Sequence, residues 1–341
     1  MGFSCWTGYP TFAIRIHKEI NPTEVHGSDY SRAMPSHLNM KSSSRQRRSS
    51  SAILDWIGLV PFFAFVLAFL ILPSLNLFSG AFKDARGNFT LANINFLTDQ
   101  YVLKAYAVSL EVSVITSLFG GVFGFLVAYA ITIGNTPRWM RSILMTFSGL
   151  AANFGGVPLA FAFIATLGRT GFITAILKSI CYAGASGTQV CPFNPYDHGF
   201  NLYSMYGLVL AYMYFQFPLM VLTITPALEG LKKDWREASE NLGATSFQYW
   251  RDVAFPILWP SILGATMLLF GSAFGAFATA QALTGGSIYL VTILIGQQIR
   301  GDVLGNPNEG YALALGMVVV MAITITAYTI LQRQTARWLK V

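Results

Sequence analysis

The sequence predicts an all-α, polytopic membrane protein with about six transmembrane helices. First, 54% of its 341 residues are hydrophobic and only 11% are charged, which is too little polar surface for a water-soluble protein of this length. Second, uncharged apolar runs of about 20 residues recur, and that length crosses a hydrocarbon core roughly 30 Å thick. Third, Lys and Arg are concentrated in alternate connecting loops, as in proteins that cross a bilayer repeatedly.

Residues 1–51 are polar, rich in Ser and Arg, and end in S-S-S-R-Q-R-R-S-S-S. We expect a disordered, basic cytoplasmic tail, since no apolar core of a signal peptide precedes the first apolar run. Met34 or Met40 would serve as well as Met1 as the start residue. Detection of peptides from residues 1–33 by mass spectrometry would exclude the two shorter forms.

The apolar runs place five spans, at residues 56–75, 112–133, 143–167, 202–228 and 310–331. A sixth lies within the uncharged stretch 253–299, which is too long for one helix, and Gly285-Gly286 is expected to end that helix near Leu283. Residues 52–104 are then the first transmembrane helix with an external segment, 105–331 are the core, and 332–341 are a carboxyl-terminal tail.

The distribution of Lys and Arg predicts which loops face the cytoplasm. With the amino terminus inside, the inside segments after the first span hold Arg138, Arg141, Lys232, Lys233, Arg236, Arg251, Arg333, Arg337 and Lys340. The longer outside segments hold Lys83, Arg86, Lys104, Arg169, Lys178 and Arg300. The inside segments are the more densely basic, so we expect both termini and residues 229–256 in the cytoplasm. The net charge of +7 follows from this bias and from the basic tail, and it does not indicate nucleic-acid binding.

The outside segment 168–201 is the longest, and its glycines and prolines interrupt any long helix. We interpret it as an insertion on the core. Cys181 and Cys191 share this segment, where an oxidising compartment could join them. Their spacing permits a disulfide without requiring one, so the sequence leaves the pairing open.

A polar segment, E-A-S-E-N-L-G-A-T-S-F-Q-Y-W-R-D-V-A-F-P at residues 237–256, separates the fourth span from the fifth. Asp234 is placed to cap a short helix, with Glu237 three positions on as its partner in a capping box. Gly243 is expected to end that helix in the left-handed conformation, which glycine adopts without strain.

Ser246 or Thr245 would cap a second short helix that runs towards Ala254, and Pro256 would end it before the fifth span. Apolar side chains share one face of each helix, namely Trp235, Ala238 and Leu242 on the first and Phe247, Trp250 and Ala254 on the second. In a cytoplasmic loop such side chains are expected to bind a groove on a partner protein. An amphipathic loop lying at the lipid interface is the alternative.

The spacing of this loop resembles the cytoplasmic coupling loop of ABC importer permeases, which reads E-A-A, three residues, G, nine residues, I-x-L-P. In register are Glu237, Ala238, Gly243 and Pro256, whereas Ser239, Val253 and Phe255 replace the usual Ala, Ile and Leu. The resemblance covers about residues 106–331 and implies the MetI-like permease fold in the inner membrane.

The same resemblance implies the partners. The loop would dock into a groove on a cytoplasmic ATPase subunit, with Glu237 against the ATPase surface and Gly243 supplying the turn. A pair of permease subunits, two copies of this chain or this chain and a related one, would form the pathway, and a pair of ATPases would drive it. An external solute-binding protein would deliver the solute.

Several chemical motifs do not occur in the sequence. There is no G-x-x-x-x-G-K-[ST] phosphate loop, so ATP hydrolysis is expected from a separate subunit. There is no H-E-x-x-H motif and no G-x-S-x-G nucleophile elbow either. We therefore expect a transport subunit with no metal site and no cofactor, and not an enzyme.

An ion-coupled secondary transporter is the alternative function. Such proteins place an ionisable group near the middle of the membrane. Among the predicted spans Glu111 is the candidate, and we interpret it as an interface residue within about two turns of the outer end. Uptake measured with the ion gradients collapsed and ATP retained would separate the two classes.

Uncharged polar side chains in or near the spans are candidates for the translocation route, because burying them alone in lipid is costly. They are Asn153, Gln216, Thr279 and Gln281. The pairs Gly120-x-x-x-Gly124 and Gly271-x-x-x-Gly275 instead predict close helix packing.

Residues 288–310 look like the outside helix and turn that precede the last span in permeases for polyamines, ferric iron and phosphonates. That resemblance implies polyamine (spermidine or putrescine), ferric iron or phosphonate as the solute, although sugar, sulfate and molybdate importers share the architecture.

Overall fold

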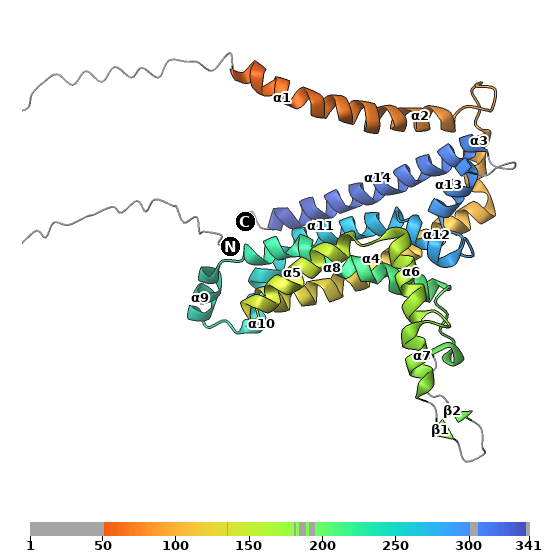
Figure 1. Ribbon diagram of the computed structural model, residues 1–341. Helices are drawn as coiled ribbons and strands as arrows, with labels where there is room; N and C mark the ends of the chain where they lie inside the picture. Colours follow the sequence, from red (N-terminus) through yellow and green to blue (C-terminus); the bar gives the residue numbers. More distant parts are fainter. Residues whose placement is uncertain are drawn as a thin grey trace, which may run out of the picture. The chain divides into compact units, whose positions relative to one another are not determined.

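The structure is a computed structural model that describes residues 51–134, 136–180, 182–183, 189–190, 195–300 and 306–338 (Figure 1). Residues 1–50 of the predicted tail lie outside the described residues, as do Cys181 and Cys191 of the predicted pair. Pro61–Val341 form one compact structural unit. Of the preceding unit, Met1–Val60, the structure describes only the beginning of the first helix.

The described elements are almost all helical, as predicted. In chain order they are α1 (Ser51–Val66), η1 (Leu67–Ile71), α2 (Leu72–Ala81), α3 (Ala92–Asn95), η2 (Phe96–Thr98), α4 (Gln100–Thr132), α5 (Arg138–Asn153), α6 (Gly156–Leu167), α7 (Phe172–Ser179), β1 (Tyr182–Ala183), β2 (Gln189–Val190), η3 (Pro195–His198), α8 (Met205–Glu229), α9 (Lys233–Asn241), α10 (Ser246–Tyr249), η4 (Trp250–Ala254), α11 (Phe255–Phe274), α12 (Ala278–Thr284), α13 (Val291–Arg300) and α14 (Pro307–Trp338). The two short strands pair antiparallel within the predicted outside insertion.

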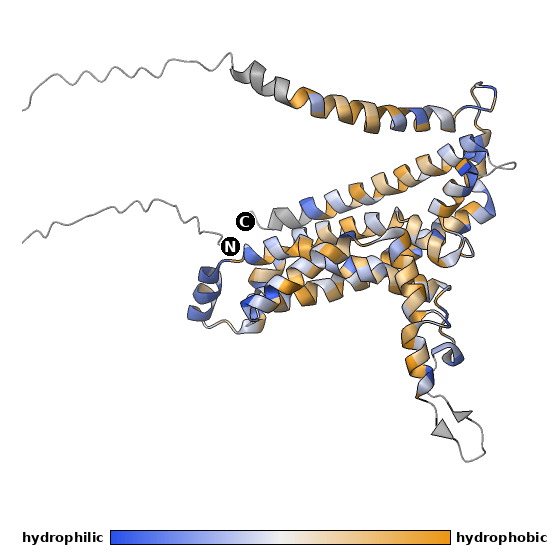
Figure 2. Cartoon of the chain, in the orientation of Figure 1, coloured by the Kyte–Doolittle hydropathy of each residue, from blue (hydrophilic) through white to orange (hydrophobic). Residues whose placement is uncertain are grey.

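Six described segments are long and apolar enough to cross a membrane, which confirms the predicted number. They are Leu59–Ala81, Gln100–Thr132, Gly156–Ser179, Met205–Glu229, Ser246–Phe274 and Pro307–Arg333. Figure 2 shows hydrophobic residues along α4, α8, α11 and α14, and hydrophilic residues gathered on α9. The polar segment between the fourth and fifth spans therefore stands apart from the apolar helices.

The core is built around α4, α8 and α11. Gly120 and Gly124 let α4 approach α8 closely, since a Cβ on Gly124 would lie 2.5 Å from the Cβ of Met220. Gly271 likewise leaves room for Met321 of α14. The predicted role of these glycines in close packing is confirmed for these contacts, and dispersion attraction between the touching backbones stabilises the bundle.

Two helices contain a π-helical turn just before a proline. η1 precedes Pro73, and η4 precedes Pro256. Proline has no N–H to donate and its ring collides with the carbonyl four residues earlier, so the wider turn relieves that collision and lets the helix continue. In η4 the N–H of Phe255 donates to the carbonyl of Trp250, five residues back.

The predicted third span, 143–167, is wrong as a single helix. α5 ends at Asn153, and after Phe154 and Gly155 the chain turns so that α6 and α7 lead away from the direction of α5 (Figure 1). Gly156 begins α6 with φ +72°, a left-handed conformation that interrupts a helix. The apolar run spans both pieces because hydropathy alone does not register a break in the backbone.

The span predicted within residues 253–299 is also divided. α11 ends at Phe274, and a separate short helix, α12, follows from Ala278. α12 ends at Thr284 because Gly285 and Gly286 take φ values of +59° and +85°. The predicted end of the spanning helix near Leu283 is therefore wrong, because that helix ends at Phe274, and Gly285-Gly286 end the separate helix α12 instead.

Candidate coupling loop and translocation residues

The first loop helix, α9, begins without a side-chain cap. Its N-cap residue is Lys232, and Asp234 lies inside the first turn. The predicted capping box of Asp234 with Glu237 is therefore wrong. The Asp234 carboxylate still lies near the positive end of the helix dipole, which favours an acidic residue there without a hydrogen bond to the backbone.

The end of α9 confirms the prediction for Gly243. Gly243 has φ +81°, and its N–H donates to the carbonyl of Glu240 at 2.9 Å. The next N–H, that of Ala244, donates to the carbonyl of Ser239 at 3.0 Å. This pair of bonds is the Schellman arrangement, in which a left-handed glycine satisfies the last carbonyls of the helix. A Cβ at Gly243 would meet nothing within 4 Å, so the turn is open to its surroundings.

The second loop helix begins as predicted but does not end at Pro256. Thr245 caps α10, with its hydroxyl accepting from the N–H of Gln248 and the Gln248 side chain accepting from the N–H of Thr245. The helix then continues through η4 and α11, with Pro256 in the first turn of α11. Ser246–Phe274 is thus one helical segment, because the π turn accommodates the proline.

Apolar side chains at the tip of the loop are exposed. Leu242 is 89% exposed, Phe247 73% and Trp235 37%, and Ala238 is exposed as well. The prediction that Trp250 and Ala254 share that exposed face is wrong. Both pack against the bundle, and Trp250 contacts Tyr129 of α4 edge to face with ring centroids 5.0 Å apart.

The remaining motif residues differ in exposure. Glu237 and Phe255 are exposed, whereas Ser239, Val253 and Pro256 are half-buried. The Ser239 hydroxyl donates to the carbonyl of Arg236 at 2.7 Å, so the polar replacement for the usual Ala is satisfied within its own helix.

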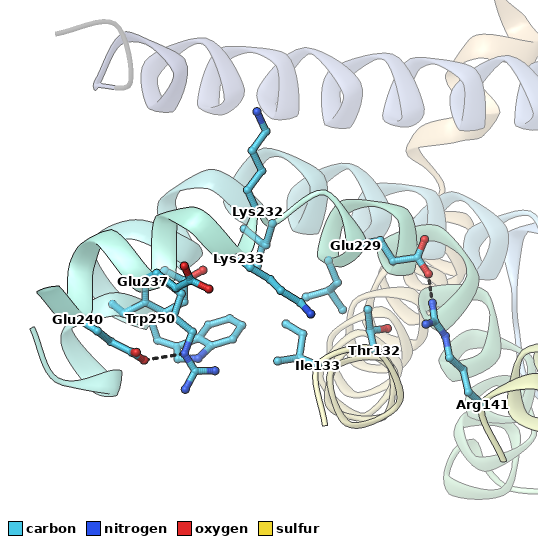
Figure 3. Close-up of a pocket in the computed structure, with 13 residues that line it drawn as sticks. Thr132, Ile133, Arg141, Glu229, Lys232, Lys233, Glu237, Glu240 and Trp250 are labelled. Atoms are coloured by element: carbon cyan, nitrogen blue, oxygen red, sulfur yellow. Dashed lines mark hydrogen bonds and ion pairs between the residues drawn. The ribbon is translucent and has the colours of Figure 1, made fainter. Parts of the chain in front are cut away.

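An open pocket of about 800 Å³ lies where α4, α8, α9 and α10 meet (Figure 3). Its charged lining is mixed, and Arg141 forms an ion pair with Glu229 at the end of α8. Arg236 donates to Glu240 at 2.9 Å, and that hydrogen bond and charge raise the pKa of the Arg236 guanidinium above its ordinary value. The Arg141–Glu229 pair joins α5 to α8 three residues before Lys232, the N-cap residue of α9.

The four candidate route residues lie in different surroundings. Gln216 of α8 is fully buried, and its Nε2 donates to the Leu269 carbonyl of α11 at 2.9 Å, while its Oε1 has no hydrogen-bond partner among the described residues. Thr279 is buried between α12 and α6. Asn153 is exposed at the end of α5, and Gln281 is half-buried on α12. The structure brings Asn153 and Thr279 to the same helix break and leaves Gln216 in the middle of the bundle.

Glu111 lies on α4, eleven residues after Gln100, with an exposed side chain. That places it about three turns from the start of the helix. Among the described residues there is no group of three or more His, Cys, Asp or Glu side chains that could hold a metal ion.

Sequence reasoning missed the polar residues that hold the break between α11 and α12. The carbonyl of Ala276 accepts from the Tyr212 hydroxyl at 2.9 Å and from the Thr292 hydroxyl at 3.3 Å. At the start of α13, the Ser109 hydroxyl of α4 accepts from the N–H of Val291 at 2.9 Å. Tyr212 and Ser109 lie 64 and 182 residues from their partners, so no local sequence pattern indicates these bonds.

Comparisons with known proteins agree with this architecture. Residues 120–341 match the model of the family described as binding-protein-dependent transport system inner membrane component. The chain is 24% identical over 270 residues to a probable sulfate transport system permease of Prototheca wickerhamii, covering 77% of this chain and 96% of that protein. It is 25% identical over 278 residues to the spermidine/putrescine permease PotB of Haemophilus influenzae, covering 78% and 90%.

Among solved structures, a chain of a bacterial ABC transporter that imports alginate superposes with a TM-score of 0.65 at 17% identity. The match covers 83% of this chain and 96% of that one, and it supports the fold alone. Because the family model spans most of the chain, including α8, the Gly243 loop and α11, the protein belongs to the inner-membrane permease components of binding-protein-dependent ABC transport systems.

Proposed function

We propose that this chain forms half of a solute pathway and is moved by a cytoplasmic ATPase that binds the loop from α9 to η4. The observation that carries the proposal is the Gly243 turn between α9 and α10. On its two sides Leu242, at the end of α9, and Phe247, on α10, are exposed. Exposed apolar side chains on a short, fixed loop are suited to burial in a groove of a partner. ATP hydrolysis is left to that partner, since the chain carries no phosphate loop.

The other partners follow from the same proposal. A second permease subunit, a copy of this chain or a related one, completes the pathway, and an external binding protein supplies the solute. The loop and both termini are cytoplasmic, which the Lys and Arg distribution supports. Family membership favours ATP-driven import over the ion-coupled alternative, and the exposed position of Glu111 offers no buried ion-binding carboxylate on α4.

Sulfate is the first solute to test, because a sulfate permease matches this chain over nearly its own full length. The sequence-based expectation of a polyamine, ferric iron or phosphonate is not confirmed, although one matched relative is a polyamine permease. A thermal-shift screen of the cognate binding protein against sulfate, spermidine, ferric citrate and a phosphonate distinguishes these solutes. Stabilisation by sulfate alone would support sulfate as the solute. Stabilisation by spermidine alone would contradict sulfate and support a polyamine.

The coupling itself is tested by cysteine crosslinking. A single cysteine at Leu242, with the native cysteines replaced by serine, should react with a membrane-impermeant maleimide only from the cytoplasmic side. Addition of the ATPase subunit should protect it. Labelling from the external medium, or equal labelling with and without the ATPase, would contradict the proposal.

A further inference from the structure

Two helix breaks lie side by side in the bundle. One separates α5 from α6 at Phe154 and Gly155, and the other separates α11 from α12 between Phe274 and Ala278. α6 packs mainly against α12. Residues far apart in the sequence therefore meet where two backbones are interrupted.

A single hydroxyl joins the two breaks. The Oγ1 of Thr279 accepts from the N–H of Gly156 at 2.8 Å and donates to the carbonyl of Gly156 at 3.2 Å. Gly156 is the first residue of α6, so its N–H has no partner within the helix. Thr279 is 3% exposed, and this pairing therefore satisfies backbone groups away from water.

The two breaks are anchored unequally. The break at α11 is fixed to the core, because the Ala276 carbonyl accepts from Tyr212 of α8 and from Thr292 of α13. α6 packs on its helical neighbours through apolar groups such as Leu159 and the ring of Phe163, and its far end is held by the Tyr196 hydroxyl, which donates to the Leu167 carbonyl at 2.7 Å. Apolar contacts tolerate sliding, whereas hydrogen bonds fix direction and distance.

We propose that Thr279 is a positioning residue that fixes the register of α6 on α12, so that the two helix breaks hold one geometry and move as one unit. The attachment itself does not depend on the proposed transport function. The joint movement during the transport cycle does rest on it, and the two parts are therefore tested separately.

Four full-length forms test the attachment: the unsubstituted chain, Thr279→Val, Thr279→Ser and Thr284→Val. Thr284 is the matched control, because it lies on the same helix, is 7% exposed, and its hydroxyl donates only to the Ala280 carbonyl of its own turn. Each form carries spin labels at Phe161, which is exposed on α6, and at Gln281 on α12, with the native cysteines replaced by serine. Electron–electron distance distributions are recorded in lipid nanodiscs, and the melting temperature is measured in parallel.

The unsubstituted chain, Thr279→Ser and Thr284→Val should give one narrow distance distribution. Thr279→Val should give a broadened or second distribution, with the ratio of displaced to native α6 raised roughly five- to thirtyfold, as expected for the loss of a buried hydrogen bond. A narrow distribution in a folded Thr279→Val protein would overturn the proposal. Equal broadening in Thr284→Val would do the same, because a general loss of packing would then account for both.

The second part uses the same labels in the complex with its ATPase, with and without vanadate-trapped nucleotide. The distance between α6 and α12 should stay constant in the unsubstituted chain, while a pair at Leu150 of α5 and Phe161 of α6 should change. A change between α6 and α12 would refute the joint movement. Failure to form any ATPase complex would instead count against the proposed function and leave the result in nanodiscs intact.

Discussion

Gly243→Asp tests the proposed docking of an ATPase on the Gly243 loop most directly. Gly243 has φ +81°, and a Cβ there would meet nothing within 4 Å. The cost within the chain is therefore only the left-handed strain of a non-glycine residue, about 1–2 kcal/mol and at the lower end for Asp, which visits this conformation. Against a docked ATPase the same carboxylate would lose water without a partner, which costs several kcal/mol. Since each 1.4 kcal/mol is tenfold, affinity for the ATPase should fall by at least a hundredfold.

The assay is binding of the purified ATPase subunit to the permease in nanodiscs, together with uptake by reconstituted vesicles. Gly243→Asn introduces a side chain that tolerates the left-handed conformation without a charge, and should lose less affinity than Asp. Gly87→Asp is the matched control, because Gly87 has φ +84° and open space around it in the turn after α2. Wild-type binding and uptake by Gly243→Asp would refute the docking reasoning, and equal losses in Gly87→Asp would assign the effect to folding.

Three further substitutions address the scaffold around the loop. Gly124→Ala should destabilise the protein by about 1–3 kcal/mol in thermal unfolding, because the new methyl would overlap α8; Gly149→Ala, which meets nothing within 4 Å, should not. Thr245→Ala removes the cap of α10 and should cost about 1 kcal/mol, seen as faster amide exchange at Gln248 with unchanged exchange in α14. Gln216→Leu removes the bond to α11 together with the unpaired Oε1, so the melting temperature should stay nearly constant. A fall in uptake by that stable variant would place Gln216 on the route, and unchanged uptake would exclude it.

The parts of the fold that were predictable from the sequence are those set by local chemistry. Gly243 ends a helix because a left-handed residue is needed there, and the Thr245 cap depends on side chains within one turn. Apolar length likewise fixes the number of spans. Each of these signals lies within a window of a few to about twenty residues.

The errors arose where the outcome depends on a distant partner or on a choice between two backbone geometries. The run 143–167 contains G-G-V-P at its centre, but the hydrogen bonds that Gly156 makes at the break are to Thr279, 123 residues away. A proline inside a helix usually breaks or kinks it, but here the π turn of η4 accommodates Pro256 and the helix continues. The sequence pattern predicted Asp234 as the N-cap residue, because an Asp side chain caps a helix better than a Lys side chain. In the structure the helix begins earlier, and Lys232 occupies the N-cap position.

The continuity of Ser246–Phe274 changes how the loop can act. If Pro256 had ended the second loop helix, the loop would be a separate structural element joined to α11 by a flexible connection. Instead, 29 residues form one helical segment that extends roughly 43 Å from the exposed Phe247 to the break after Phe274. A helix of that length carries a tilt at one end to the other, and its far end lies where Tyr212 and Thr292 hold the Ala276 carbonyl. Displacement of Phe247 by a partner would therefore act on this anchored break and, through the bonds between Thr279 and Gly156, on α6 as well.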